Sequence, residues 1–186
     1  MLKQSPSQTV GPFFSFALTP EDYGFQSIAN HQLVNETTPG EHIEIEGRML
    51  DGEGRPVPDA VIDLWQADHN GNHSTNPTGG TGFTGFGRCA TDTQGRFRFL
   101  TVKPGRVDSS QAPHVSLAIF ARGLTNHVFT RVYFAADSAN DTDPVLVHID
   151  AARRETLIAT PGESSPAIYQ IDIRLQGDDE TVFFDA

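Results

Sequence analysis

Cysteine is nearly absent from this sequence, which holds a single thiol, Cys89, among its 186 residues. An internal disulfide needs two cysteines, so the fold has to form without one, and we expect a reducing compartment such as the cytoplasm. The first residues lack an apolar stretch followed by a small-residue cleavage site, and no run approaches about 20 apolar residues. The sequence therefore predicts neither a secretory signal nor a contact with the membrane.

Basic residues are also scarce. The chain has 13 Lys and Arg against 24 Asp and Glu, which gives a formal net charge of -11. An electrostatic field of this sign repels phosphate backbones, so nucleic acid is not expected as a partner. The same field repels small anionic substrates, and a site for such a substrate would need a local cation.

Turn-forming residues and phenylalanine are frequent, with 17 Gly, 12 Pro and 13 Phe. Between the turns lie short segments in which apolar and polar residues alternate, the pattern of half-buried strands. The predicted strands are residues 41–50, 60–67, 89–90, 96–102, 114–123, 127–134, 155–160, 167–175 and 181–184. Many short strands with Gly and Pro turns predict an all-β fold, specifically a prealbumin-like β-sandwich over residues 40–186.

The first 39 residues follow a different pattern, with several proline-containing turns and no sustained periodicity. We expect residues 1–39 to form an irregular N-terminal arm with one helical turn at Pro20–Tyr23. Such an arm cannot stabilise itself, so it should lie on its own core or pack on a partner subunit. One further short helix is expected within residues 143–155.

Five separated segments carry a family resemblance. They are SQTVGPFF, GEHIEIEGRMLDGEGRPVPDAVIDLWQAD, GFGRCATDTQGRFRFLTVKPG, APHVSLAIFARG and QIDIRLQGDDETVFFD. In this order they resemble the intradiol ring-cleaving dioxygenases over nearly the whole chain, most narrowly the alpha chains of the members that cleave protocatechuate. The resemblance implies a ferric, non-haem dioxygenase of the β-ketoadipate route. It also implies a homologous beta chain as partner, within a higher hetero-oligomer.

The iron ligands of the family can be checked one by one. Members hold the ion with two tyrosinates and two histidines, and a hard ferric ion suits anionic oxygen donors. At the matching positions this sequence has His73, Val107, His114 and Ser116. Valine has no lone pair, and two neutral imidazoles are too few for a ferric site. We therefore expect Fe3+ on the beta chain only, with His114 a hydrogen-bonded residue and His73 a solvated one.

The resemblance instead assigns this chain to the wall of the substrate pocket. The matching residues are Thr9, Gly11 and Pro12 in the arm, where Gly11 permits close backbone approach and Pro12 stiffens the turn. The other match is Arg122, whose guanidinium suits the carboxylate of protocatechuate. Two alternatives stay open, a loosely docked arm and a structural ion pair at Arg122. Arg131 is the rival cation.

The predicted function is thus that of a non-iron alpha subunit. It completes the pocket of an enzyme that converts protocatechuate and O2 to 3-carboxy-cis,cis-muconate. One alternative is a non-catalytic, prealbumin-like binding module, which should be a stable monomer. Another is a complete iron enzyme, whose isolated chain would be coloured by tyrosinate-to-iron charge transfer.

Overall fold

Strands make up most of the regular structure of the chain. The computed structural model describes residues 3–11, 13–73, 82–163, 165 and 167–185. Its strands are β1 His42–Leu50, β2 Val61–Gln66, β3 Phe86–Ala90, β4 Arg96–Val102, β5 His114–Phe120, β6 Val128–Phe134, β7 Ile158–Pro161, β8 Ile168–Gln170 and β9 Ile173–Arg174. Its helical segments are α1 Phe14–Leu18, η1 Pro20–Tyr23, η2 Ser138–Thr142, η3 Leu146–His148, α2 Ala151–Arg154 and η4 Glu155–Leu157. Within these ranges no helix has the length and apolar character to cross a bilayer.

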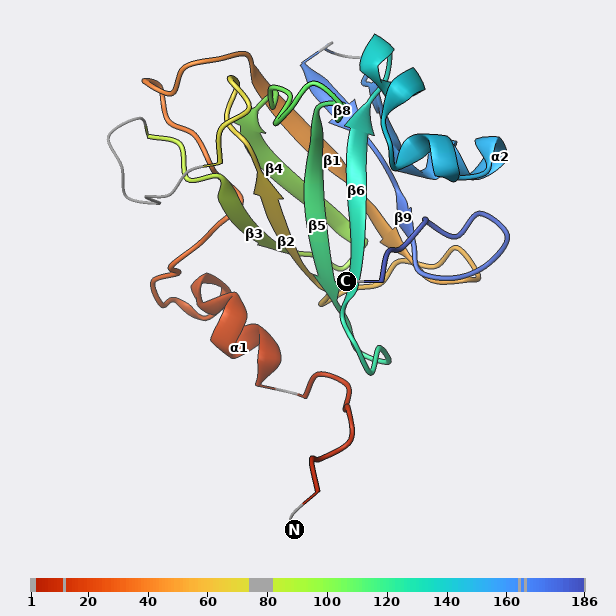
Figure 1. Ribbon diagram of the computed structural model, residues 1–186. Helices are drawn as coiled ribbons and strands as arrows, with labels where there is room; N and C mark the ends of the chain where they lie inside the picture. Colours follow the sequence, from red (N-terminus) through yellow and green to blue (C-terminus); the bar gives the residue numbers. More distant parts are fainter. Residues whose placement is uncertain (1–2, 12, 74–81, 164, 166, 186) are drawn as a thin grey trace.

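The nine strands form one sheet that folds over on itself. Its order is β3-β2-β5-β6-β7-β8-β1-β4, with β9 paired to β1. Figure 1 shows β3, β2, β5 and β6 in one layer, with β4, β1 and β9 behind them. The short strand β7 joins the layers, because it pairs with β6 through residues 158–159 and with β8 through residues 160–161. The prediction of an all-β fold is confirmed, and the prealbumin-like assignment stays a prediction.

Alternation along β5 explains both the core and the exposed face of the first layer. Val115, Leu117 and Ile119 are buried, and each contributes roughly 1.5–3 kcal/mol on transfer from water. They belong to one apolar cluster with side chains of the other layer, such as Ile45 and Phe99. The intervening residues of β5 must then point outward, since side chains alternate across a strand. This outer face carries His114 and Ser116, two of the residues at ligand-matched positions.

The last three predicted strands are only partly strands in the structure. Residues 155–157 form the helical turn η4, and only residues 158–161 of that segment are a strand. The 167–175 segment is split into β8 and β9 on either side of Ile171, whose carbonyl passes so close to β1 that only glycine fits at residue 47. Residues 181–184 make one isolated bridge, in which the Phe184 N–H donates to the Phe129 carbonyl at 2.8 Å.

The N-terminal arm is less irregular than predicted. The helical turn at Pro20–Tyr23 is confirmed, and α1, which the sequence did not indicate, precedes it. The end of the arm is part of the sheet: the Leu33 N–H donates to the Leu100 carbonyl at 2.9 Å, and the Leu33 side chain is buried. In Figure 1 the segment before α1 runs close to the β5–β6 turn, and Thr9 in this segment bonds to Gly123.

Candidate functional site

The outer face of β5 and its neighbours brings together three of the four ligand-matched residues. His114 and Ser116 lie two residues apart on β5, and Ser116 stands opposite Trp65 of β2. The Trp65 indole N–H donates to Nδ1 of His73 at 3.2 Å. His73 is exposed, as predicted, but this hydrogen bond ties it to the sheet. Val107 is exposed and makes no contribution of donor atoms.

His114 is held by its backbone surroundings. Its Nδ1 lies 2.9 Å from the Ala112 carbonyl oxygen, so Nδ1 carries the proton that is donated. Its ring packs against Tyr133, with the ring centres 5.4 Å apart. Burial lowers the pKa of His114; the Ala112 carbonyl opposes this, and the charge of Arg131 adds to the lowering. The imidazole is therefore neutral at pH 7.

These residues do not fit a ferric ion. The His73 Nδ1 lone pair accepts the indole proton, so its Nε2 carries the hydrogen of the neutral ring. Nε2 of His114 is then the one imidazole lone pair of the set that is open to a metal. Ser116 adds a neutral hydroxyl and Val107 adds nothing. Among the residues that the structure describes, no group of three or more His, Cys, Asp or Glu is arranged to hold a metal.

A buried carboxylate stabilises the start of β5, and the sequence did not point to it. Asp143 accepts the backbone N–H groups of Ala112 at 2.8 Å, Val145 at 2.9 Å and Leu146 at 3.0 Å. It also accepts the Tyr133 hydroxyl at 3.2 Å. Burial raises the pKa of Asp143, but the three N–H donors and the hydroxyl outweigh it, and the net pKa is lowered. Burial raises the pKa of Tyr133 to about 12, so it is a neutral donor.

The arm and the end of β5 bring two of the predicted pocket residues together. Thr9 Oγ1 accepts the backbone N–H of Gly123 at 2.8 Å, which places the arm beside Arg122 although 114 residues separate the two bonded groups. The Arg122 side chain is 69% exposed, and its Nε lies 2.8 Å from Oδ2 of Asp59. The structural ion pair considered as an alternative is thus present, and the guanidinium is still open to solvent.

The other two predicted pocket residues of the arm, Gly11 and Pro12, are less informative about the site. A side chain at Gly11 would meet no atom within 4 Å, so nothing within the described part of the chain requires glycine there. Pro12 lies outside the described residues. A groove of about 160 Å3 separates the arm from the β5–β6 turn. It is lined by Gln8, Val10, Phe120, Ala121, Leu124, Thr125, Asn126 and His127.

The rival cation, Arg131, lies on β6 beside the first half of β5, away from the arm. It stands opposite Ser116 on β6, and its Nη1 donates to the Tyr133 hydroxyl oxygen at 3.3 Å. Arg131 and Ser116 line a hollow of about 330 Å3 that is otherwise mainly apolar. Arg131 is therefore part of the region around the ligand-matched residues and does not reach the arm.

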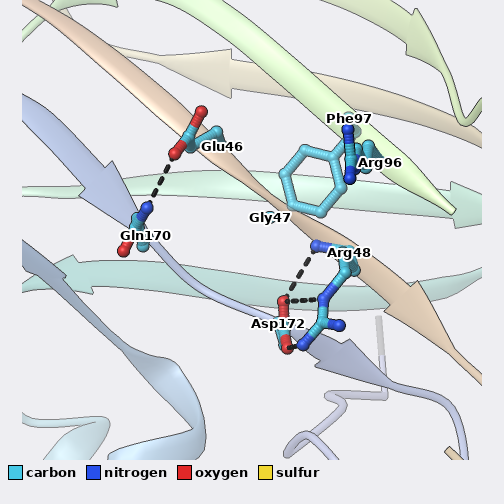
Figure 2. A pocket seen from close by; sticks show the side chains of 7 residues that line it. All are labelled: Glu46, Gly47, Arg48, Arg96, Phe97, Gln170 and Asp172. Atoms are coloured by element: carbon cyan, nitrogen blue, oxygen red, sulfur yellow. Dashed lines mark hydrogen bonds and ion pairs between the residues drawn. The ribbon is translucent and has the colours of Figure 1, made fainter. Parts of the chain in front are cut away.

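A larger hollow, of about 510 Å3, lies on the opposite layer and contains none of the predicted site residues. Figure 2 shows its lining, with Gly47 at its centre. Four of its polar side chains are paired: Gln170 donates to Glu46 at 2.8 Å, and Arg48 donates to Asp172 at 2.6 Å, whereas Arg96 has no side-chain partner among the described residues.

Comparison with known proteins places this geometry in a family. A family model described as Dioxygenase matches residues 10–177. The chain belongs to this dioxygenase family. The result confirms the relationship that the five sequence segments suggested, and the family's activity is generally iron-dependent.

Individual relatives in the dioxygenase family sharpen the comparison. The chain is 44% identical to a protocatechuate 3,4-dioxygenase alpha chain from Burkholderia cepacia, over 99% of this chain and 98% of that one. It is 34% identical to the beta chain of the same enzyme from that organism, over 83% and 72%. A solved dioxygenase domain from Streptomyces sp. SirexAA-E superposes with a TM-score of 0.65 at 24% identity, covering 94% and 99% of the two chains. This last likeness concerns the fold alone.

Proposed function

We propose that this chain is the alpha subunit of a protocatechuate 3,4-dioxygenase. The chain is similar to such an alpha chain over nearly its whole length. The observation that carries the proposal is the contrast between two regions of this chain. The ligand-matched residues lack the donors for a ferric ion, whereas Arg122 and the arm stand together and face solvent. The proposal assigns Fe3+ to a homologous beta chain, within a larger hetero-oligomer in the cytoplasm.

The reaction assigns specific tasks to this chain's residues. Protocatechuate carries a carboxylate and two adjacent hydroxyl groups. The bond between the two hydroxylated carbons breaks, each carbon receives one oxygen atom of O2, and the product is 3-carboxy-cis,cis-muconate. Arg122 would pair with the carboxylate that is already present on the ring, which counters the repulsion from a protein of net charge -11. Thr9 would keep the arm at the pocket wall through its bond to Gly123.

The partner would dock on the arm. Several large apolar side chains of the arm are exposed, and these are Phe13, Phe16, Tyr23, Phe25 and Ile28. The Phe16 ring meets the Tyr23 and Phe25 rings edge-on, with each pair of ring centres 5.5 Å apart. An exposed aromatic cluster is typical of an interface that a second chain covers. We therefore propose that residues 1–39 pack on the beta subunit.

Co-purification tests this function. The chain should be purified alone and together with a beta chain, and iron content, visible absorption and O2 uptake with protocatechuate should be measured for each. We expect the isolated chain to be colourless and inactive, and the two-chain complex to contain iron and to consume O2. Oxygen uptake by the isolated chain would contradict the proposal, as would a beta chain that forms a complete enzyme without this one.

A further inference from the structure

The partner of Arg122 is set by the pairing of β2 with β5. The antiparallel register places Val61 opposite Phe120. Continuing that pairing two residues past the end of the ladder brings residue 59 opposite residue 122. Asp59 stands there, and its Oδ2 is 2.8 Å from Nε of Arg122. The ion pair therefore follows from strand register, and the chain separation of its members hid it from sequence analysis.

The turn that carries Asp59 is tied down by one side chain, Thr91. The Ala60 N–H donates to Thr91 Oγ1 at 2.9 Å, and that hydroxyl donates to the Val57 carbonyl at 2.8 Å. The Thr91 N–H donates in turn to the Ala60 carbonyl at 2.8 Å. Three hydrogen bonds thus hold the backbone on either side of Asp59, so its carboxylate has a defined place beside β5.

Two further features of Asp59 are unusual for a surface residue. Its φ is 61°, in the left-handed region that disfavours most side chains. Its Oδ1 is buried and has no hydrogen-bond partner among the residues that the structure describes. Backbone strain and an unsatisfied buried oxygen both disfavour the folded state, and such features are commonly found at functional sites.

We propose that Asp59 is a positioning residue that holds the Arg122 guanidinium in place for the substrate carboxylate. The inference rests on the proposed function, because it concerns the same pocket. Arg122 is 69% exposed, so without a partner its long side chain would sample many rotamers and lose that freedom on binding. Asp59 contacts Nε, and a guanidinium has five N–H donors, so donors remain for a second carboxylate.

The test uses the two-chain complex and substitutions that suit a left-handed backbone. Asp59→Gly removes the carboxylate and relieves the strain, because glycine adopts positive φ freely. Asp59→Asn keeps an oxygen that can accept from Nε and tolerates the same conformation. Arg122→Ala tests the receptor itself. Asp172→Asn is the matched control, since Asp172 pairs with Arg48 at 2.6 Å on the other layer.

Two constants separate positioning from general damage. These are the KM for protocatechuate and the inhibition constant of catechol, a competitor that lacks the carboxylate. We expect Asp59→Gly to raise the KM roughly fivefold, with kcat and the catechol constant within about twofold of wild type. Asp59→Asn should recover most of the loss. Arg122→Ala should raise the KM roughly 30-fold, and Asp172→Asn should change neither constant.

The outcomes distinguish this inference from the function on which it rests. If Arg122→Ala raises the KM and Asp59→Gly leaves it unchanged or lowers it, Asp59 does not position the arginine, and the proposed receptor stands. If Arg122→Ala leaves the KM unchanged, Arg122 does not bind the substrate carboxylate, and the positioning role of Asp59 is wrong as well. A parallel rise in the KM and in the catechol constant for Asp59→Gly would mean a distorted pocket and would also overturn the inference. Thermal unfolding of each complex checks that the variants fold.

Discussion

The two ends of β5 use polar residues in opposite ways. At its start, His114 and its neighbour Tyr133 lie in a closed network that ends on the buried carboxylate of Asp143. Just past its end, Arg122 pairs with Asp59 on the surface and stays open to solvent. A closed network stabilises the fold and leaves few groups for a ligand, whereas an open pair can bind one.

The difference separates polar groups that stabilise the fold from a charged group that remains accessible. The polar groups at the start of β5 form hydrogen bonds within the protein. Few of them would therefore be buried and unsatisfied without a metal or a ligand. The charge at the end of β5 has a partner that does not enclose it. We therefore expect substitutions at the start to change stability and substitutions at the end to change substrate binding.

Asp143→Ala should have the largest effect. It leaves three backbone N–H groups and the Tyr133 hydroxyl without their acceptor in a buried place. We expect a loss of about 3 kcal/mol in the free energy of unfolding, since each unsatisfied buried group costs about 1–3 kcal/mol and water will reach some of them. Urea denaturation of the isolated chain measures it. A loss below about 1 kcal/mol would mean that the network at the start of β5 is not the structural one.

Arg122→Ala should have the next largest effect, on binding alone. Losing a charge-assisted pair with the substrate carboxylate should raise the KM for protocatechuate roughly 30-fold. Stability should change little, because the exposed pair with Asp59 is worth at most about 1 kcal/mol. Steady-state kinetics and iron analysis of the complex provide the check, with iron content expected to stay at the wild-type level. A loss of iron would mean that Arg122 supports the metal site, which would contradict the assignment of Arg122 to substrate binding alone.

Strong acid should weaken the network at the start of β5. The pKa of Asp143 is lowered from its ordinary value of 3.8 in the folded chain. A carboxylate of this kind stabilises the fold fully above its unfolded pKa, and the stabilisation is lost as the pH falls through the folded pKa. The free energy of unfolding should therefore decrease below about pH 4. Asp143→Asn, measured over the same range, should show a shallower decrease, and an identical slope would exclude Asp143 as the cause.

Tyr133→Phe should have the smallest effect. It removes one hydroxyl that donates to Asp143 and accepts from Arg131, while the three backbone donors to Asp143 remain. We expect a loss of about 1 kcal/mol in stability, with the KM and the iron content of the complex unchanged. Paired denaturation and kinetic measurements decide the matter. A rise in KM with little change in the free energy of unfolding would indicate that both ends of β5 bind the substrate.

Much of the fold could be predicted because strand patterns are local. The alternation of Val115, Leu117 and Ile119 with polar residues is visible in the sequence, and the strand at 96–102 has the predicted limits. The weak predictions were those that depend on distant partners. The strand predicted at 181–184 is a single bridge to Phe129 of β6, and that pairing depends on a residue far away in the sequence. The helix α1 lacks a capping side chain, so no local signal marked it.

The sequence by itself determined which donor atoms this chain possesses: a valine and a serine where a ferric site needs anionic or aromatic donors, and an arginine suited to a carboxylate. Those identities hold whatever the chain's conformation. Only the tertiary structure decided which groups meet, because strand register placed Asp59 beside Arg122 and packing placed Asp143 under Tyr133. The Asp59–Arg122 contact joins residues far apart in the chain, and the partner and burial of a charged group decide what it can do.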